Sequence, residues 1–271
     1  VTGIATAYMD SIPVVAITGN VTRNLLGLDS FQEVDITGIT MPVTKHNYIV
    51  KDIRDLASIL REAFQIANSG RKGPVLVDIP KDITAQTCAY EKQPPLPLAE
   101  CGLPPQERLA QALELLNRAE RPFVYCGGGV VLSEASEALS AFVEKLDAPV
   151  SCSLMCQGGF DQASPRYMGM LGMHGTKTAA LAIQNCDLFI AVGTRFSDRV
   201  LCNAGLFARH CPILQIDIDS AEFNKNIEVD LRLRGDAKEI LNTLQGMLET
   251  KDHRAWMADV ASWKQAYPLR Q

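Results

Sequence analysis

Apolar residues follow two different rhythms in the first 90 residues of the chain. Short β-branched runs at 14–17 and 75–79 each follow a proline and are typical of strands buried on both faces of a sheet. Between them, apolar side chains recur at steps of three and four residues from Ile53 to Ala67, and the pattern ends at Gly70. This spacing predicts a long amphipathic helix with a glycine stop. The segment is therefore predicted as strand, helix, strand. This is an incomplete domain, because so few elements leave the faces of a parallel sheet uncovered.

A fuller alternation of strands and helices follows residue 105. Strands are predicted at 123–126, 150–152, 188–192 and 213–216, and helices around 109–116, from Ser133 to Leu146, after Thr176, and from Asp236 to Leu248. Asp236 opens the last of these helices, and Glu239 stands three residues later, which is the spacing of a capping box. Strands that alternate with helices predict an α/β protein with doubly wound parallel sheets.

Five of the fourteen prolines lie between Pro94 and Pro105, in a stretch without helical or strand periodicity. Such a stretch is typical of a linker. We therefore expect residues 91–105 to join a truncated domain, residues 1–90, to a complete domain, residues 106–250, and residues 251–271 to start a connection to a further domain. The sequence does not begin with Met, so we expect it to be an internal piece of a longer protein.

Charge and hydropathy narrow the class of partner. The chain has 26 Lys and Arg against 31 Asp and Glu, a formal net charge of −5. This balance argues against nucleic acid or an anionic membrane as the main partner, because both attract basic surfaces. No apolar run approaches the roughly 20 residues of a membrane span, and no secretory signal opens the sequence. We expect a cytoplasmic protein.

The chain contains eight cysteines, at positions 88, 101, 126, 152, 156, 186, 202 and 211. They form no Cys-x-x-Cys pair, and no two of them stand beside histidines at the spacing of zinc ligands. We therefore expect no metal site among them, and we interpret them as small, reduced, buried side chains.

Residues suited to a nucleotide gather where the strands of the second domain end. Parallel α/β sheets bind ligands outside the carboxyl ends of their strands. Glycines 127–129, residues 153–155, residues 193–199 and the acidic pair in 217–219 each follow a predicted strand. Glycines let the backbone approach a ligand, and acidic side chains accept ribose hydroxyls. The set favours a nucleotide-like cofactor, although a glycine turn alone is equally typical of a tight strand-to-helix connection.

Two further features have open interpretations. The loop 170–175, rich in glycine and methionine, precedes a predicted helix, and its methionines either fill core gaps or form a wall against an aromatic ring system. His174 in this loop is either bonded to backbone or part of a site. Lys81 follows the strand 75–79 and is either solvated or catalytic.

Six motifs together give the chain a family resemblance over almost its whole length. They are TGIATAYMDS at 2–11, DSFQE at 29–33, TKHNY at 44–48, GPVLVDIPKD at 73–82, LGMHGT at 171–176 and RFSDRV at 195–200. In this order and spacing the chain resembles the catalytic large subunit of biosynthetic acetolactate synthase, a transferase that depends on thiamin diphosphate and carries FAD. The resemblance implies that residues 1–90 are the C-terminal half of a thiamin pyrimidine-binding domain and that 106–250 form a complete Rossmann-like FAD-binding central domain.

The resemblance also implies site residues. It places FAD contacts at Arg71, Gly127, Gly128, Gly129, Ser153, Leu154, Met155, Leu171, Gly172, Met173, His174, Gly193, Thr194, Arg195, Asp198, Arg199, Val200, Asp217, Ile218, Glu222, Gly235, Asp236 and Ala237. Phe31, Gln32 and Lys81 match positions that face the active site of a partner subunit, and Arg199 matches the residue that recognises the carboxylate of the second 2-oxo acid. A guanidinium suits that task because it pairs bidentately with a carboxylate. No residue of the chain is implied as a metal ligand.

The activity implied is decarboxylation of pyruvate and transfer of the remaining two-carbon unit to a second pyruvate or to 2-oxobutanoate, in branched-chain amino-acid biosynthesis. The main ligands of thiamin diphosphate and Mg²⁺ in the family lie outside this segment, so we expect the segment alone to be inactive. A homodimer or homotetramer and a small regulatory subunit are also implied. Two alternatives stay open: a stand-alone flavin-binding module without catalysis, and a related FAD-carrying enzyme such as glyoxylate carboligase.

The chain departs from the family pattern at four positions. Asn20, Thr22 and Ser30 stand where many relatives have Gln, Pro and Ala, in the substrate channel of the family. Ser197 replaces a frequent Asp and so removes a carboxylate beside Arg195. These departures bear on inhibitor sensitivity and on the hold on FAD, not on the reaction.

Overall fold

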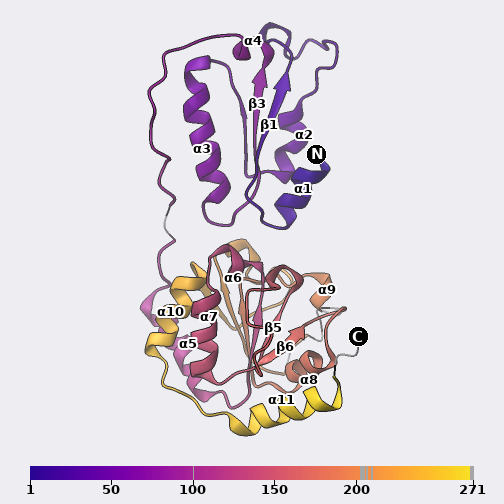
Figure 1. Ribbon diagram of the computed structural model, residues 1–271, viewed down its shortest axis with the longest axis vertical. Helices are drawn as coiled ribbons and strands as arrows, with labels where there is room; N and C mark the ends of the chain where they lie inside the picture. The colour runs from indigo at the N-terminus through magenta and orange to yellow at the C-terminus, as the bar shows by residue number, and fades with distance from the viewer. Residues whose placement is uncertain (100, 202–204, 206, 209, 269–271) are drawn as a thin grey trace. The chain divides into compact units, whose positions relative to one another are not determined.

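The computed structural model describes residues 1–99, 101–201, 205, 207–208 and 210–268 (Figure 1). The chain divides into two compact units, Val1–Glu100 and Cys101–Gln271. The division falls inside the proline-rich stretch 91–105, where the sequence offers few apolar side chains to bury.

The first unit contains a three-stranded parallel sheet in the order β1-β3-β2. Its elements are α1 (Thr2–Met9), β1 (Val15–Asn20), the 3-10 turns η1 (Arg23–Leu25) and η2 (Met41–Val43), α2 (Ile36–Thr40), β2 (His46–Ile49), η3 (Ile53–Asp55), α3 (Leu56–Asn68), β3 (Val75–Pro80) and α4 (Lys81–Thr84). The central strand β3 is buried except at Ile79, as its β-branched run predicts. Figure 1 shows α3 on one side of this sheet and α1 and α2 on the other.

The expected strand, helix, strand order of the first unit is present but incomplete. The helix α3 ends at Asn68, just before Gly70, whose φ of +55° suits a glycine. The sequence did not predict β2, because its four residues include His46 and Asn47 and show no apolar alternation. The unit also leaves large apolar side chains exposed, among them Ile17 on the edge strand β1. Its own core is therefore small.

The second unit contains a six-stranded sheet in the order β6-β5-β4-β7-β8-β9, with all pairs parallel. Its strands are β4 (Pro122–Cys126), β5 (Val150–Cys152), β6 (Tyr167–Met170), β7 (Leu188–Val192), β8 (Ile213–Asp217) and β9 (Leu231–Arg234). Its helices are α5 (Gln106–Arg118), α6 (Gly128–Leu132), α7 (Ser136–Leu146), α8 (Lys177–Asn185), α9 (Asp198–Leu201), α10 (Ala237–Met247) and α11 (Arg254–Ala266), with the 3-10 turns η4 (Leu154–Cys156) and η5 (Ser220–Glu222). The predicted α/β class with parallel sheets is confirmed.

Helices cover both faces of this sheet. Val124 and Cys126 of β4 face a core cluster that includes side chains of α5, α7 and α10. Phe123 and Tyr125 of the same strand face a second cluster, which includes side chains of α8 and α11. Figure 1 shows α5, α7 and α10 together on one side. Because β4, β7 and β8 are buried at every position, their sequences carry no polar alternation.

Several elements of the second unit differ from expectation. The strands β6 and β9 were not predicted, and α7 begins at Ser136 instead of Ser133 because Glu134 adopts a left-handed φ of +53°. The chain after residue 250 belongs to this unit: α11 buries Trp256 and Val260 in the second cluster, and the Trp256 indole donates to the Pro122 carbonyl at 3.0 Å. The predicted helix start at Asp236 is confirmed, since its carboxylate accepts from the N–H groups of Lys238 and Glu239.

Among the described residues, no helix is long and apolar enough to cross a membrane. The cytoplasmic location stays a prediction.

We predict that Val124→Ala lowers the free energy of unfolding of the second unit by roughly 2–4 kcal/mol, because it removes two methyl groups from a fully buried strand and leaves a cavity. Val131→Ala is the matched control: this side chain is 45% exposed in α6, so the change costs less than about 0.5 kcal/mol. Both tryptophans lie in the second unit, so denaturation followed by tryptophan fluorescence reports it. Equal effects of the two substitutions would contradict the burial of β4.

Candidate nucleotide-binding edge

The sheet of the second unit changes direction between β4 and β7. From β4 the chain adds β5 and β6 on one side, and from β7 it adds β8 and β9 on the other. In open parallel sheets such a switch point leaves a crevice at the carboxyl ends of the two central strands, because their following loops diverge. The turns after β4 and β7 are Gly127–Gly129 and Gly193. The predicted glycines therefore lie at the switch point.

These two glycine turns pack backbone against backbone. A Cβ on Gly129 would lie 2.7 Å from the Cα of Gly193, and a Cβ on Gly127 would overlap the Gly193 carbonyl oxygen. The Gly129 N–H donates to that same carbonyl at 3.0 Å, and Gly193 adopts a φ of +58°. Side chains are therefore excluded by the contact between the turns. Glycine here is required for the tight strand-to-helix connection, and the backbone left bare is open to a ligand as well.

An exposed apolar surface, formed by Leu154 and Met155, lies beside the glycine turns. The segment after β5 exposes Leu154 and Met155, and a Cβ on Gly128 would lie 3.1 Å from the Cβ of Met155. The Ser153 N–H donates to the Cys126 carbonyl at 2.8 Å, which fixes this segment against the end of β4. The exposed methionine and leucine thus border the switch point.

The loop after β6 contacts the segment that contains Arg199. The Met173 N–H donates to the Arg199 carbonyl at 2.7 Å, and a Cβ on Gly172, at φ +109°, would overlap the backbone of that residue. The Arg199 guanidinium lies 3.6 Å from the Met173 sulfur and 3.8 Å from the carboxylate of Asp198. Arg199 and Asp198 are both exposed, so this ion pair is weak and leaves the guanidinium open to an anion. The helix expected after Thr176 is α8, and the Thr176 side chain caps it by accepting from the Ala179 N–H at 3.0 Å.

Acidic side chains follow β8 and β9 at the same edge. Asp217 is buried and accepts from the Asp219 N–H at 2.9 Å, and Glu222 is buried beside Lys225, with 2.9 Å between carboxylate and ammonium. The Gly235 N–H donates to the Asp217 carbonyl, which joins the ends of the two strands. Asp236 is engaged as the cap of α10. These carboxylates are thus already held by backbone donors or by a lysine.

Two supporting residues were missed by the sequence interpretation. Gln215 is fully buried in β8 and donates to the Thr194 carbonyl at 3.2 Å. Asn226 donates to the carbonyls of Arg195 and Phe196, the latter at a φ of +50°. An amide inside the apolar run 213–216 was a signal for the first. Nothing in the sequence marked Asn226, because its partners lie 30 residues away.

The structure therefore brings most of the predicted cofactor residues to one edge. The members on this edge are Gly127, Gly128, Gly129, Ser153, Leu154, Met155, Leu171, Gly172, Met173, His174, Gly193, Thr194, Arg195, Asp198, Arg199, Val200, Asp217, Ile218, Glu222, Gly235, Asp236 and Ala237. Their contact with a cofactor stays a prediction. Arg71, Phe31, Gln32 and Lys81 belong to the other unit.

In the first unit, Lys81 lies at the carboxyl end of β3, exposed at the start of α4. Side-chain hydrogen bonds join the carboxyl end of β1 to β3. Buried Asp78 accepts from Thr18 at 2.7 Å and from Asn20 at 2.6 Å. Arg23 binds the carboxylate of Asp82 at 2.6 Å. The Arg23–Asp82 ion pair thus holds the loop after β1 against the start of α4, where Lys81 lies.

Of the other predicted residues of the first unit, Phe31 and Gln32 lie in the loop after β1, and Arg71 lies at the other end of the sheet. Arg71 precedes β3, at the opposite end from Lys81, and donates to the Ser11 hydroxyl at 3.0 Å. Phe31 and Gln32 form a turn closed by the Glu33 N–H on the Ser30 carbonyl, with Phe31 87% exposed. A phenylalanine so exposed is available to a partner surface.

Three thiols lie buried where β4 and β5 end. Cys126 and Cys152 are paired in register, and Cys156 is buried in η4. Burial raises the pKa of the Cys126 thiol well above its ordinary value. The expectation of buried cysteines is confirmed for Cys126, Cys152, Cys156, Cys186 and Cys211. It is wrong for Cys88, which is exposed, and Cys101 is only half-buried. Cys202 lies outside the described residues.

Comparison with known proteins identifies the class. The sequence profile of the family described as "Thiamine pyrophosphate enzyme, central domain" matches residues 109–244, the part of the chain that forms the six-stranded sheet. The chain therefore belongs to the thiamine pyrophosphate enzyme family.

Individual relatives narrow this class. The acetolactate synthase isozyme 2 large subunit of Escherichia coli (strain K12) is 44% identical over 99% of this chain and 49% of its own length. The acetolactate synthase large subunit of Parasynechococcus marenigrum is 44% identical over 99% of the chain and 45% of its own length. A probable acetolactate synthase large subunit of Methanocaldococcus jannaschii is 43% identical over 97% of the chain and 46% of its own length. The predicted resemblance is confirmed, and the chain spans about half the length of these relatives.

We predict that Gly193→Ala destabilises the second unit by at least about 1–3 kcal/mol, because an alanine at φ +58° is strained and its Cβ would meet Gly129 at 2.7 Å. Gly246→Ala is the matched control: it is exposed in α10 with nothing within 4 Å of its Cβ, so stability is unchanged or rises by up to about 1 kcal/mol. Urea denaturation of both variants measures the difference. A neutral Gly193→Ala would contradict the contact between the turns.

We also predict that iodoacetamide at neutral pH labels Cys88 and spares Cys126. The thiolate is the reacting form, and burial both raises the pKa of Cys126 and blocks access to its sulfur. Peptide mass spectrometry after brief labelling checks this, with a denatured sample as control in which both thiols react. Labelling of Cys126 as fast as Cys88 in the folded protein would show that the end of β4 is open.

Proposed function

We propose that the chain is part of an acetolactate synthase large subunit. The whole protein would decarboxylate pyruvate and join the remaining two carbons to a second pyruvate or to 2-oxobutanoate. The 43–44% identity to acetolactate synthase large subunits over almost the whole chain carries this proposal. The comparisons give no support to a stand-alone flavin module or to glyoxylate carboligase. A homodimer or homotetramer, a regulatory subunit and Mg²⁺ in the whole enzyme remain part of the proposal.

The carboxyl edge of the second unit fits a dinucleotide such as FAD. Strand order β6-β5-β4-β7-β8-β9 is the doubly wound order whose switch point takes nucleotides in Rossmann-like folds. The bare backbone at Gly127, Gly129 and Gly193 is a cradle that any Cβ would fill. Exposed Leu154, Met155 and Met173 supply apolar surface of the kind that covers a ring system. FAD would be held by these residues and by Arg195, as a structural cofactor without net redox work.

Arg199 is the residue of this chain that we assign to the second 2-oxo acid. Its guanidinium is 66% exposed and only weakly paired with Asp198, so it can turn its N–H groups towards a carboxylate. Its backbone is fixed by the hydrogen bond from Met173, which holds the side chain at the edge of the proposed cofactor site. Thiamin diphosphate, when bound, supplies the electron sink for decarboxylation. The role of Arg199 is to orient the acceptor acid for the step that follows.

We predict that the chain binds FAD at least tenfold more tightly than NAD. Exposed Leu154, Met155 and Met173 offer apolar area that the three-ring flavin covers more fully than the single nicotinamide ring does. Fluorescence titration with each nucleotide measures both dissociation constants. Tighter binding of NAD would overturn the FAD proposal and leave the family assignment intact.

In the full-length enzyme, Arg199→Ala should slow carboligation by roughly one to two decades, because a charge-assisted hydrogen bond worth about 1.5–3 kcal/mol is lost. Decarboxylation of the first pyruvate should change much less. Arg254→Ala is the control, since that arginine is exposed and forms its ion pair with Asp252 at the surface. Equal loss of both steps, restored by added FAD, would instead make Arg199 a cofactor anchor.

A further inference from the structure

The amino edge of the same sheet brings together two thiols and an imidazole. Strands β7 and β8 are neighbours in register, with Phe189 opposite Ile213. Cys186 immediately follows α8 and precedes β7, and Cys211 precedes β8. The register therefore places both cysteines at the start of adjacent strands, at the end of the sheet opposite the glycine turns. Sequence spacing hid this pair, because 25 residues separate the two thiols.

The ligand atoms have the separations of a soft-metal site. The two sulfurs lie 3.6 Å apart, and an imidazole nitrogen of His210 lies within 4.8 Å of both. Two thiolates on one tetrahedral zinc, with bonds of about 2.3 Å, stand about 3.8 Å apart. Closing the site thus needs a movement of the exposed His210 side chain towards the two sulfurs.

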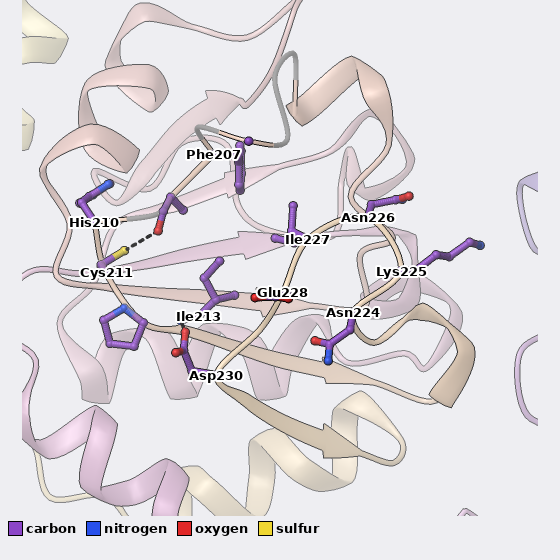
Figure 2. A pocket seen from close by; sticks show the side chains of 13 residues that line it. Phe207, His210, Cys211, Ile213, Asn224, Lys225, Asn226, Ile227, Glu228 and Asp230 are labelled. Carbon is purple, nitrogen blue, oxygen red and sulfur yellow. Dashed lines mark hydrogen bonds between the residues drawn. The ribbon is translucent and has the colours of Figure 1, made fainter.

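Among the described residues, the two thiols have only weak hydrogen-bond partners. Cys186 donates to the Ile183 carbonyl at 3.3 Å, and Cys211 lies 3.7 Å from the Ala208 carbonyl (Figure 2). These contacts explain how the two thiols are accommodated in the protein. They give no reason for the His210 imidazole to lie beside them.

The cluster opens to the surface through a cavity of about 750 Å³ (Figure 2). His210 and Cys211 line one part of it, and Asp230 and Glu228 add negative charge to its wall. The Asp230 carboxylate accepts from the Ile213 N–H at 2.8 Å, and that of Asp187 accepts from the N–H groups of Glu120 and Arg121. These aspartates are therefore held by backbone and attract a cation without serving as its ligands. The cavity gives an ion and a water molecule a route to Cys211 and His210.

We propose that Cys186, Cys211 and His210 bind one zinc ion, with the fourth position taken by water from the cavity. Both thiols lose their protons to solvent on binding, and His210 coordinates as the neutral imidazole. The ion links the end of α8 to the start of β8 and to the segment before it. Its role is a clamp at the amino edge of the sheet, and it is independent of the nucleotide proposed for the carboxyl edge.

Cobalt substitution tests this site. The full-length protein, without a histidine tag and reduced, is freed of metal and titrated with Co²⁺. We expect one equivalent to produce thiolate-to-cobalt charge transfer and the visible bands of tetrahedral cobalt, and one equivalent of Zn²⁺ to displace it. Zn²⁺ should also raise the melting temperature of the second unit.

Variants separate the site from other thiols. Cys211→Ser and Cys186→Ser should abolish the charge-transfer band, and His210→Gln should weaken binding by more than the roughly 10–100-fold typical of an outer-shell partner. Cys88→Ser, at an exposed thiol of the first unit, should leave the spectrum unchanged. Circular dichroism of each variant separates a lost ligand from a lost fold, and the zinc-dependent melting shift of the unmutated protein stands without variants.

Three outcomes would overturn the proposal. They are the absence of a charge-transfer band in the reduced protein, a band that persists in a folded Cys211→Ser variant, and oxidation by hydrogen peroxide to a Cys186–Cys211 disulfide in a protein that takes up no cobalt. The last outcome would make the pair a redox couple instead of a metal site.

Discussion

The contact between the Gly129 and Gly193 backbones is the constraint on which the second unit depends. It holds together the turns that leave the two central strands, at the point where the sheet reverses its order. A side chain on either residue would push the turns apart, and with them β4 and β7, whose side chains fill both core clusters. Packing of the sheet and exposure of bare backbone at its carboxyl edge are thus one feature. The same two glycines therefore serve both the packing of the sheet and the proposed ligand site.

The carboxyl ends and the amino ends of the strands in the six-stranded sheet gather different kinds of side chain, and one reason explains both sets. In a parallel sheet all strands start at one edge and finish at the other, so residues at equivalent positions of successive strands gather whatever their distance in sequence. The carboxyl edge gathers glycines, methionines and arginines, and the amino edge gathers Cys186, His210 and Cys211. Both faces of the sheet are covered by helices, which leaves the edges as the places where polar groups reach solvent.

The first unit follows the same logic with a smaller core. Buried Asp78 in β3 organises its carboxyl edge by accepting from Thr18 and Asn20 of the neighbouring strand. Asn20 is one of the departures from the family pattern, and here its amide has a defined partner. Lys81 follows at the end of the same strand, whereas Arg71 stands at the other end. The predicted residues of this unit therefore do not form one cluster within it.

The sequence by itself determined the α/β class and the strands that are buried on both faces, because short, continuous β-branched runs are typical of such strands. It also determined the helix start at Asp236, whose side chain bonds within its own turn. The short strands β2 and β6 were not predicted because their four residues show no alternation of apolar and polar side chains. The strand β9 was missed although Leu231–Arg234 alternates between buried leucine and exposed arginine. Only the tertiary structure decided that Gly129 meets Gly193, that Asn226 supports Phe196, and that Cys186 meets Cys211 beside His210. Each of these contacts joins residues that are 25 or more positions apart, and strand register, which no local pattern encodes, brings them together.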